Sequence, residues 1–229
     1  MTEPRTVGIL GGMGPEATMC LMDRVIAAAG EDQVPLLVDM NTKVPSRISA
    51  DCKIDDMDPV PVLVAMAKRM QTAGAEALVM PCNMAHQYAA EIATAVDIPL
   101  LDMVVLTSRA AVAVAGEGGK VGILGSLALQ EVGIFDVAVA AAGGQAVYPD
   151  DPATLLDAIR EIKISGVTPY VRDKLVLASY NLLWQGAQVQ LVGCTEFSLL
   201  DRAMDPGAIK IDALDVLVQA IVEFSKGTA

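Results

Sequence analysis

The amino-acid sequence predicts an α/β fold of two pseudosymmetric domains, each a parallel sheet flanked by helices. Short β-rich segments alternate with longer helical ones along the 229 residues. The motif VGIL occurs at Val7–Leu10 and returns 114 residues later at Val121–Leu124. Cys82 and Cys194 follow the glycines of the two copies by 74 and 72 residues. We therefore interpret the chain as an internal duplication.

The expected strands are short runs of aliphatic and β-branched residues, bounded by Gly, Pro or charged residues. Longer helical segments separate them, and such an alternation is typical of parallel strands with crossover helices. In chain order the expected strands are Thr6–Leu10, Leu36–Met40, Ala77–Met80, Lys120–Leu124, Gln145–Val147 and Gln188–Val192.

The expected helices show apolar residues at intervals of three and four. The last of them should pack back on the first half of the chain. We therefore expect one domain of residues 1–103 plus 212–229, which carries Cys82, and a second of residues 104–211, which carries Cys194. The helical segments include Val60–Thr72, Asn83–Ala95, Pro152–Lys163, Pro169–Gln185 and Ala213–Ser225, and a further helix that contains Cys20 follows GGMGP.

Composition bounds the class of protein. Hydrophobic residues make up 53% of the chain, enough for a sizeable core. No apolar run reaches the roughly 18 residues that a membrane span needs, so we expect a soluble protein. A formal net charge of -12 makes nucleic acid a poor partner. The first residues, MTEPRTVGILGG, do not have the layout of a secretory signal, so we expect a cytoplasmic protein with reduced thiols.

Two of the four cysteines stand where an expected strand ends and helical sequence begins: Cys82 in MPCNM and Cys194 in VGCTEF. Open α/β sheets bind ligands at the carboxyl ends of their strands. A helix N-terminus there would bind carboxylates and lower a thiol's pKa from about 8.5. Cys20 and Cys52 lack this placement, and we assign them no catalytic role.

A pair of thiols suits the inversion of a stereocentre. That reaction needs a base on one face of a carbon atom and an acid on the other, with the roles exchanged in reverse. A duplicated fold offers such a pair across the cleft between its domains, where we expect the active site. One His and four Cys without close ligand spacing predict no metal, and the thiols need no cofactor.

Five segments, in order and spacing, carry a resemblance to a known family. The segments are GILGGMGPEAT at Gly8–Thr18, VPSR at Val44–Arg47, MPCNMAH at Met80–His86, IK at Ile162–Lys163 and GCTEF at Gly193–Phe197. With them the chain resembles the cofactor-independent aspartate/glutamate racemase family over essentially its whole length, and within it the aspartate racemase branch. The glutamate racemases of cell-wall synthesis differ at two of the segments, with Asp-Ser-Gly after the first strand and Cys-Thr-His at the second thiol.

The resemblance implies two-base racemisation of an acidic amino acid without pyridoxal phosphate, in a two-domain protein that is often a homodimer. It makes Cys82 and Cys194 the proton donor and acceptor. Arg47 and Lys163 would hold the side-chain carboxylate, as an acidic protein that binds a dianion needs local cations. The other implied substrate-binding residues are Met13, Gly14, Asn83, Met84, Ala85, Ser126 and Thr195.

Several of these residues have simpler interpretations. Without the resemblance, Arg47 and Lys163 would be interpreted as ordinary solvated charges. Asn83 and Thr195 are expected to bind the α-carboxylate, but both are also ordinary helix caps. His86 could in principle be a base for Cys82. Because no second His exists to serve Cys194, a structural His is the better interpretation.

The chain departs from the family pattern at two threonines. Met84 replaces the Thr of the usual Cys-Asn-Thr, which removes a hydroxyl from the α-carboxylate site. In the second half Ser126 keeps one hydroxyl, and Leu129 stands where another is usual. Substrate identity is therefore less firmly indicated than reaction type.

The sequence leaves four other functions open. Glutamate, or both acidic amino acids, could be the substrate, because one methylene separates them. A maleate isomerase-like enzyme would use one cysteine as a nucleophile on an unsaturated diacid. A decarboxylase of the same superfamily fits less well, because those enzymes keep only one of the two cysteines and this chain has both. A two-domain solute-binding module leaves the paired thiols unexplained.

Overall fold

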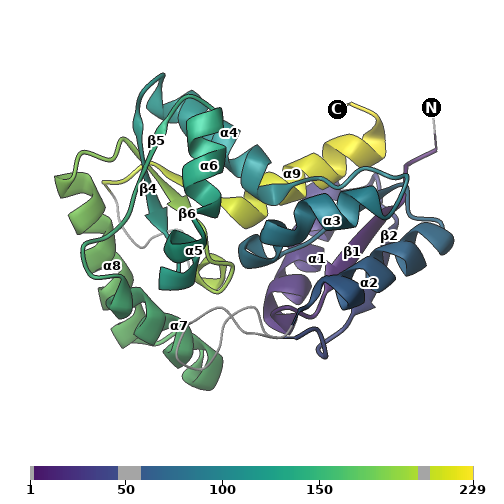
Figure 1. Ribbon diagram of the computed structural model, residues 1–229, viewed down its shortest axis with the longest axis horizontal. Coiled ribbons are helices and arrows are strands. Elements are labelled where there is room, and N and C mark those ends of the chain that lie inside the picture. Colours follow the sequence, from purple (N-terminus) through teal and green to yellow (C-terminus); the bar gives the residue numbers. More distant parts are fainter. Residues whose placement is uncertain (1–2, 46–57, 201–206, 229) are drawn as a thin grey trace. The chain divides into compact units, whose positions relative to one another are not determined.

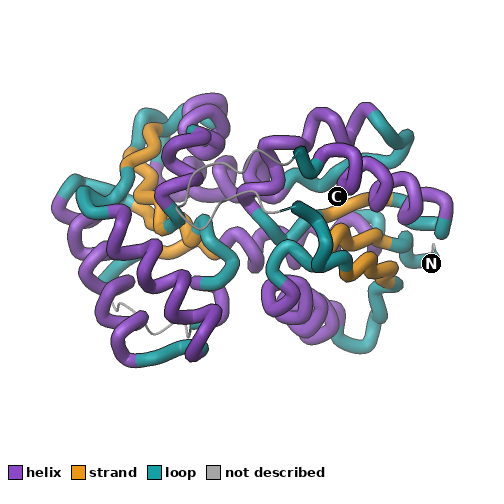
Figure 2. The backbone as a smooth tube through the Cα atoms, turned by 60° about the horizontal axis from the view of Figure 1, so that its bottom comes forward, coloured by secondary structure: helices purple, strands orange, loops and turns teal. Residues whose placement is uncertain are grey.

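The computed structural model describes residues 3–45, 58–200 and 207–228. The chain forms two compact units, Met1–Met103 with Leu214–Ala229, and Val104–Ala213. Each unit holds a parallel sheet bordered by helices (Figures 1 and 2). The predicted α/β fold class is confirmed.

The sheet of the first unit has the strand order β2-β1-β3. Its strands are β1 (Val7–Gly11), β2 (Leu36–Met40) and β3 (Ala77–Val79), all paired in parallel. All five residues of β1 are buried, as expected for a central strand covered on both faces. Beyond β3, Leu100 forms a parallel bridge to Leu78 and extends the sheet by one residue pair.

The helices of the first unit include one from the far end of the chain. In Figure 1, α9 (yellow, Ala213–Lys226) lies beside the purple N-terminal elements. Arg5 N–H donates to the Ser225 carbonyl at 2.9 Å, and the Arg24 guanidinium lies 2.8 Å from the Asp215 carboxylate. The other helices of this unit are α1 (Pro15–Ala29), α2 (Val60–Thr72), the 3₁₀ helix η1 (Asn83–Tyr88) and α3 (Ala89–Thr94).

The sheet of the second unit has the strand order β5-β4-β6-β7, again fully parallel. The strands are β4 (Lys120–Leu124), β5 (Gln145–Val147), β6 (Val189–Val192) and β7 (Lys210–Asp212). The helices are α4 (Met103–Ala115), α5 (Leu127–Val132), α6 (Ile134–Ala141), α7 (Pro152–Ser165), α8 (Pro169–Trp184) and the 3₁₀ helix η2 (Phe197–Leu199).

The six expected strands occur within one residue of their predicted ends, but two features differ from expectation. Strand β7 was not predicted, because the three residues Lys-Ile-Asp carry too little pattern. The single helix expected over Asn83–Ala95 is wrong: a 3₁₀ segment of six residues precedes the short α3. The Ala85 N–H bonds the Cys82 carbonyl three residues back, which sets the tighter winding.

Strand pairing shows the duplication in three dimensions. The two VGIL motifs form the central strands, with Gly8 beside Leu78 and Gly122 beside Gln190. On the far side of β3 and β6, Leu100 pairs with Leu78 as Lys210 pairs with Gln190. The same correspondence relates Cys82 to Cys194, since each lies four residues beyond the paired residue of its strand.

Candidate active site

Cys82 lies in a turn at the carboxyl end of β3. After the strand come Met80 and Pro81, and the cysteine itself has an extended backbone (φ -150°, ψ 104°). Cys82 is only 8% exposed. The thiol is therefore placed at the edge of the sheet where α/β folds bind ligands, and it is nearly enclosed.

His86 is a structural part of this turn. Its Nε2 accepts a hydrogen bond from the Met103 N–H at 3.1 Å, so Nδ1 carries the ring proton and donates to the Cys82 carbonyl at 2.9 Å. Burial lowers the pKa of His86, against the opposing effects of Asp102, whose carboxylate lies 4.0 Å from Nε2, and of the Cys82 carbonyl. The neutral imidazole thus links the Cys82 turn to Met103, which belongs to the same unit.

A glycine loop after β1 lines the same edge of the first sheet. Gly12 has φ +90°, and a Cβ on it would lie 2.4 Å from the Asn41 carbonyl carbon. Its N–H donates to Oγ1 of Thr18 in α1 at 3.1 Å. The neighbouring Met13 is buried, and Gly14 immediately precedes α1. The loop keeps this close approach because Gly12 has no side chain.

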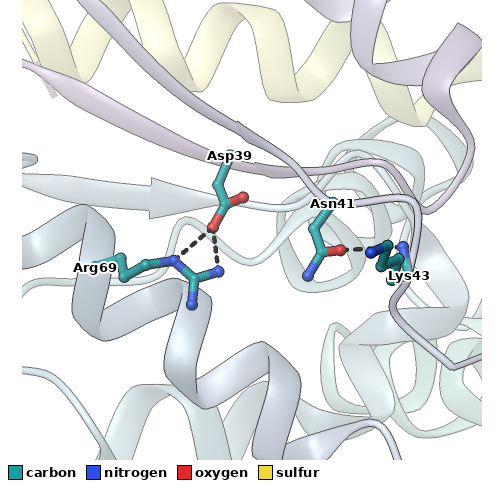
Figure 3. A network of polar contacts seen from close by, with 4 residues as sticks. All are labelled: Asp39, Asn41, Lys43 and Arg69. Carbon is teal, nitrogen blue, oxygen red and sulfur yellow. Dashed lines mark hydrogen bonds and ion pairs between the residues drawn. The ribbon is translucent and has the colours of Figure 1, made fainter.

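The chain after β2 completes this edge (Figure 3). Asn41 donates its N–H to the Gly11 carbonyl at 3.3 Å, and its side-chain oxygen accepts from the Lys43 N–H at 3.0 Å. Arg69 of α2 donates to one oxygen of Asp39 from Nε at 3.2 Å and from Nη2 at 2.6 Å. Sequence reasoning did not single out Asn41; a polar residue directly after an apolar strand was the available signal.

Cys194 occupies the corresponding turn of the second unit, two residues after β6, and is 9% exposed. The Phe197 N–H donates to the Cys194 carbonyl at 2.9 Å, as Ala85 does to Cys82. The thiol Sγ donates to Oε2 of Glu196 at 3.0 Å. Glu196 was noted in the sequence only as a departure from Cys-Thr-His, and no spacing rule indicated this contact.

Neither thiol directly precedes an α-helix in the described residues, which corrects the expected helix N-termini. η1 follows Cys82, and the three-residue η2 follows Cys194 after Thr195 and Glu196. A short 3₁₀ segment aligns few peptide dipoles, so the long-helix dipole invoked for the thiols is not provided there. At these positions an anion would be bound by the backbone N–H groups of tight turns.

The edge of the second sheet also carries two small hydroxyl residues. Ser126 is buried and precedes α5 with an extended backbone (φ -72°, ψ 157°). Thr195, next to the thiol, is buried as well. The Gly193 N–H donates to the Leu124 carbonyl at 2.8 Å, which joins the ends of β4 and β6. Ser126 and Cys194 therefore follow adjacent strands at the same edge.

The predicted site residues divide between the two units. The first unit brings Cys82, Met13, Gly14, Asn83, Met84 and Ala85 to one sheet edge, and the second brings Cys194, Thr195 and Ser126 to another. Arg47, like Cys52, lies outside the described residues. Lys163 belongs to α7, and its side chain also lies outside what the structure describes.

Within residues 3–45, 58–200 and 207–228, no group of three or more His, Cys, Asp or Glu could hold a metal ion. Nor does any helix within them have the length and apolar character to cross a membrane.

The two turns are related beyond their cysteines. Four residues after the two thiols stand His86 and Ser198. Each lies near an aspartate two residues after the next paired position, which is Leu100 in the first unit and Lys210 in the second. His86 Nε2 lies 4.0 Å from Asp102, whereas Ser198 Oγ donates to Asp212 at 2.7 Å. The two turns therefore share their backbone arrangement and differ in the polar side chains that they carry.

Comparison with known proteins gives one family. The Asp/Glu/Hydantoin racemase family model matches residues 10–221. The broad specificity amino-acid racemase RacX of Bacillus subtilis (strain 168) is 31% identical over 105 residues, 43% of this chain and 45% of RacX. The aligned part thus spans less than half of that curated relative.

Solved structures show the same fold at low sequence identity. The aspartate racemase of Picrophilus torridus matches with a TM-score of 0.80 and 21% identity over 97% of this chain and 94% of its own. Glutamate racemase isoform RacE1 of Bacillus anthracis matches with a TM-score of 0.64 and 17% identity, over 99% and 83%.

Proposed function

Because the chain belongs to the Asp/Glu/hydantoin racemase family, we propose that it is an amino-acid racemase that uses Cys82 and Cys194 as its two acid–base groups. The observation that carries this proposal is the equivalent placement of two nearly buried thiols, each in a turn beyond a parallel strand of its own duplicated unit. A duplicated frame that presents one thiol per half supplies the two groups of opposite hand that inversion requires.

In the proposed reaction one cysteine thiolate removes the α proton of the substrate and becomes a thiol. The electron pair left on the α carbon then takes the proton of the other thiol from the opposite face, and that sulfur becomes the thiolate. The reverse reaction exchanges the roles. Backbone N–H groups of the turns at Asn83 and Thr195 would bind the α-carboxylate, with help from Ser126.

The proposed substrate is an acidic amino acid, and aspartate is preferred over glutamate. The loop Gly11, Gly12, Met13 and the residue Glu196 follow the aspartate racemase pattern rather than the Asp-Ser-Gly and Cys-Thr-His of cell-wall glutamate racemases. Arg47 and Lys163 are proposed to hold the side-chain carboxylate. The similarity to RacX, a broad specificity racemase, supports the inclusion of other amino acids in the assay.

The remaining parts of the proposal are that the enzyme works without pyridoxal phosphate or a metal, that it is cytoplasmic, and that it forms a homodimer. The domain division at residues 103 and 212 is part of the same proposal. Each thiol would then come from one half of a single chain.

The test is enantiomer-resolved exchange of the α hydrogen in heavy water, followed by proton NMR. Protein dialysed against a chelator, with no pyridoxal phosphate added, is incubated separately with both enantiomers of aspartate, of glutamate and of a neutral amino acid such as alanine, and with maleate. Cys82→Ser and Cys194→Ser should each abolish racemisation, because a complete inversion uses both thiols and a serine hydroxyl is far less acidic.

A control cysteine is available in α1. Cys20, half-buried on that helix, has no part in the proposed site, and Cys20→Ser should keep full activity. Each site variant keeps one thiol and should exchange the α hydrogen of one enantiomer only, with the preference reversed between them. Full racemisation in either site variant would defeat the assignment, and turnover of maleate without α exchange would favour a nucleophilic isomerase.

A further inference from the structure

The two thiols have different surroundings although their turns are built alike. Cys194 Sγ donates a hydrogen bond to the Glu196 carboxylate at 3.0 Å. By the strand correspondence, the counterpart of Glu196 in the first unit is Met84, since each lies two residues after its cysteine. The sequence therefore carries an uncharged thioether two residues after Cys82 and a carboxylate two residues after Cys194.

The turn itself fixes the position of the Glu196 side chain. The Phe197 N–H donates to the Cys194 carbonyl at 2.9 Å and closes the turn. The Phe197 ring is buried in the hydrophobic cluster that also contains Cys194. Glu196 has a helical backbone (φ -61°, ψ -35°) and is half-buried. The fold of this turn therefore holds the Glu196 carboxylate at the Cys194 thiol.

The described elements around Cys194 include a hydrophobic cluster and a neighbouring strand that carries charges. The hydrophobic cluster that includes Cys194 draws apolar residues from β4, β6, α7 and α8. The neighbouring strand β7 carries Lys210 and Asp212, and Asp212 accepts a hydrogen bond from Ser198 Oγ at 2.7 Å. Glu196 is thus the acid whose carboxylate meets the sulfur of Cys194.

The titratable neighbour of Cys82 is arranged differently. His86 uses Nδ1 on the Cys82 carbonyl oxygen and Nε2 on the Met103 N–H. Both ring nitrogens are engaged with the backbone, so the imidazole supports the turn and does not act on the sulfur. In this turn the position that corresponds to Glu196 is Met84, whose side chain carries no charge.

A carboxylate that accepts a hydrogen bond from a thiol stabilises the protonated sulfur. Loss of that proton would place a thiolate about 3 Å from a second negative charge, which is unfavourable. We propose that Glu196 keeps the proton on Cys194, so that the resting enzyme holds a thiol at Cys194 and forms its thiolate at Cys82. This inference rests on the proposed racemase function and names the resting state of its two groups.

The proton balance of the cycle follows from this assignment. The Cys82 thiolate takes the α proton and forms an S–H bond. The carbanion pair takes the proton of Cys194 and breaks that S–H bond, which leaves a thiolate beside Glu196. Repulsion between the two anions favours reprotonation of Cys194 from solvent, while Cys82 releases its proton to solvent. Glu196 thereby resets the enzyme for the next turnover.

The kinetic test is the pH profile of racemisation for Glu196→Gln. A bell-shaped profile rises as the first thiolate forms and falls as the remaining thiol loses its proton. Under the proposal the falling limb belongs to Cys194, so Glu196→Gln should move it to lower pH by about one unit and leave the rising limb in place. The falling limb of Glu196→Asp, which keeps the charge, should lie between those of the wild type and Glu196→Gln.

A matched control removes the same charge elsewhere. Glu117 is exposed in the turn before β4, at the opposite end of that strand from the thiol edge. Glu117→Gln should leave both limbs unchanged. An equal shift in the two Gln variants would mean that net charge, rather than contact with Cys194, sets the profile, and would overturn the proposal.

A second readout does not depend on catalysis. The rate of alkylation of each cysteine by iodoacetamide is measured against pH by peptide mass spectrometry. The midpoint for Cys194 should fall by about one pH unit in Glu196→Gln, while that for Cys82 stays unchanged. An unmoved Cys194 midpoint overturns the inference. The expected shift in a protein that racemises no amino acid would instead overturn the proposed function and leave the role of Glu196 standing.

Discussion

His86 should make the stability of the protein depend on pH in the mildly acidic range. Its buried imidazole is neutral and bridges two backbone groups, the Cys82 carbonyl at 2.9 Å and the Met103 N–H at 3.1 Å. Protonation of Nε2 would place a second hydrogen against the Met103 N–H and break that bond. The folded state therefore disfavours the imidazolium.

The sign follows from the direction of the pKa shift. Burial lowers the pKa of His86 in the folded protein below its ordinary 6.5. Just below pH 6.5 the unfolded chain binds a proton that the folded chain does not, so stability is full above pH 6.5 and declines as the pH falls. The decline can be no steeper than about 1.4 kcal/mol per pH unit, the limit for one proton, and it ends where the folded state is itself protonated.

The measurement compares the wild-type protein with His86→Gln in urea unfolding at pH 7.5, 6.5 and 5.5. A glutamine does not titrate, and its amide can bond both backbone groups, so the pH-dependent difference isolates the imidazole. The carboxylates that titrate in the same range are common to both proteins. His86→Ala should lose about 1 to 3 kcal/mol at pH 7.5, because two buried hydrogen bonds disappear together.

Asp102 limits the size of the effect. Its carboxylate lies 4.0 Å from Nε2 and raises the pKa of the imidazole, although burial outweighs it. Asp102→Asn should therefore steepen the decline below pH 6.5. Parallel stability curves for wild type and His86→Gln between pH 7.5 and 5.5 would refute the neutral, bridging histidine.

Two further predictions concern substrate binding and the glycine loop. Arg47→Ala and Lys163→Ala should each weaken use of aspartate by roughly 1.5 to 3 kcal/mol in kcat/KM with little change in unfolding midpoint, because charge-assisted contacts to the distal carboxylate disappear; unchanged kinetics with aspartate and glutamate in both variants would make these residues ordinary surface charges. Gly12→Ala should destabilise the protein by more than about 1 kcal/mol, because a φ of +90° is strained for alanine and the added Cβ would lie 2.4 Å from the Asn41 carbonyl carbon. Thermal unfolding checks this prediction. Gly74→Ala is the control, because Gly74 also has a positive φ (+99°) but a Cβ there would meet no atom within 4 Å.

Local pattern was sufficient for most of the elements. Six strands and the helices at α2, α7, α8 and α9 are visible in the sequence, because a strand or a two-sided helix repeats its apolar residues at a fixed period. The helices α4, α5 and α6 were not among those expected. α5 and α6 are only six and eight residues long, and α4 (MVVLTSRAAVAVA) carries few polar residues, so each of the three offers little pattern.

The sequence by itself determined the α/β class, the duplication and the position of each cysteine after its strand. These follow from order along the chain, because parallel strands joined by crossovers bring their carboxyl ends to one edge. Only the tertiary structure decided what surrounds each sulfur. Strand register placed Asp102 near His86 and Asp212 on Ser198, and turn geometry placed Glu196 on the Cys194 thiol. Such contacts depend on angstrom-scale side-chain placement between segments, and residue spacing in a sequence carries no distance of that kind.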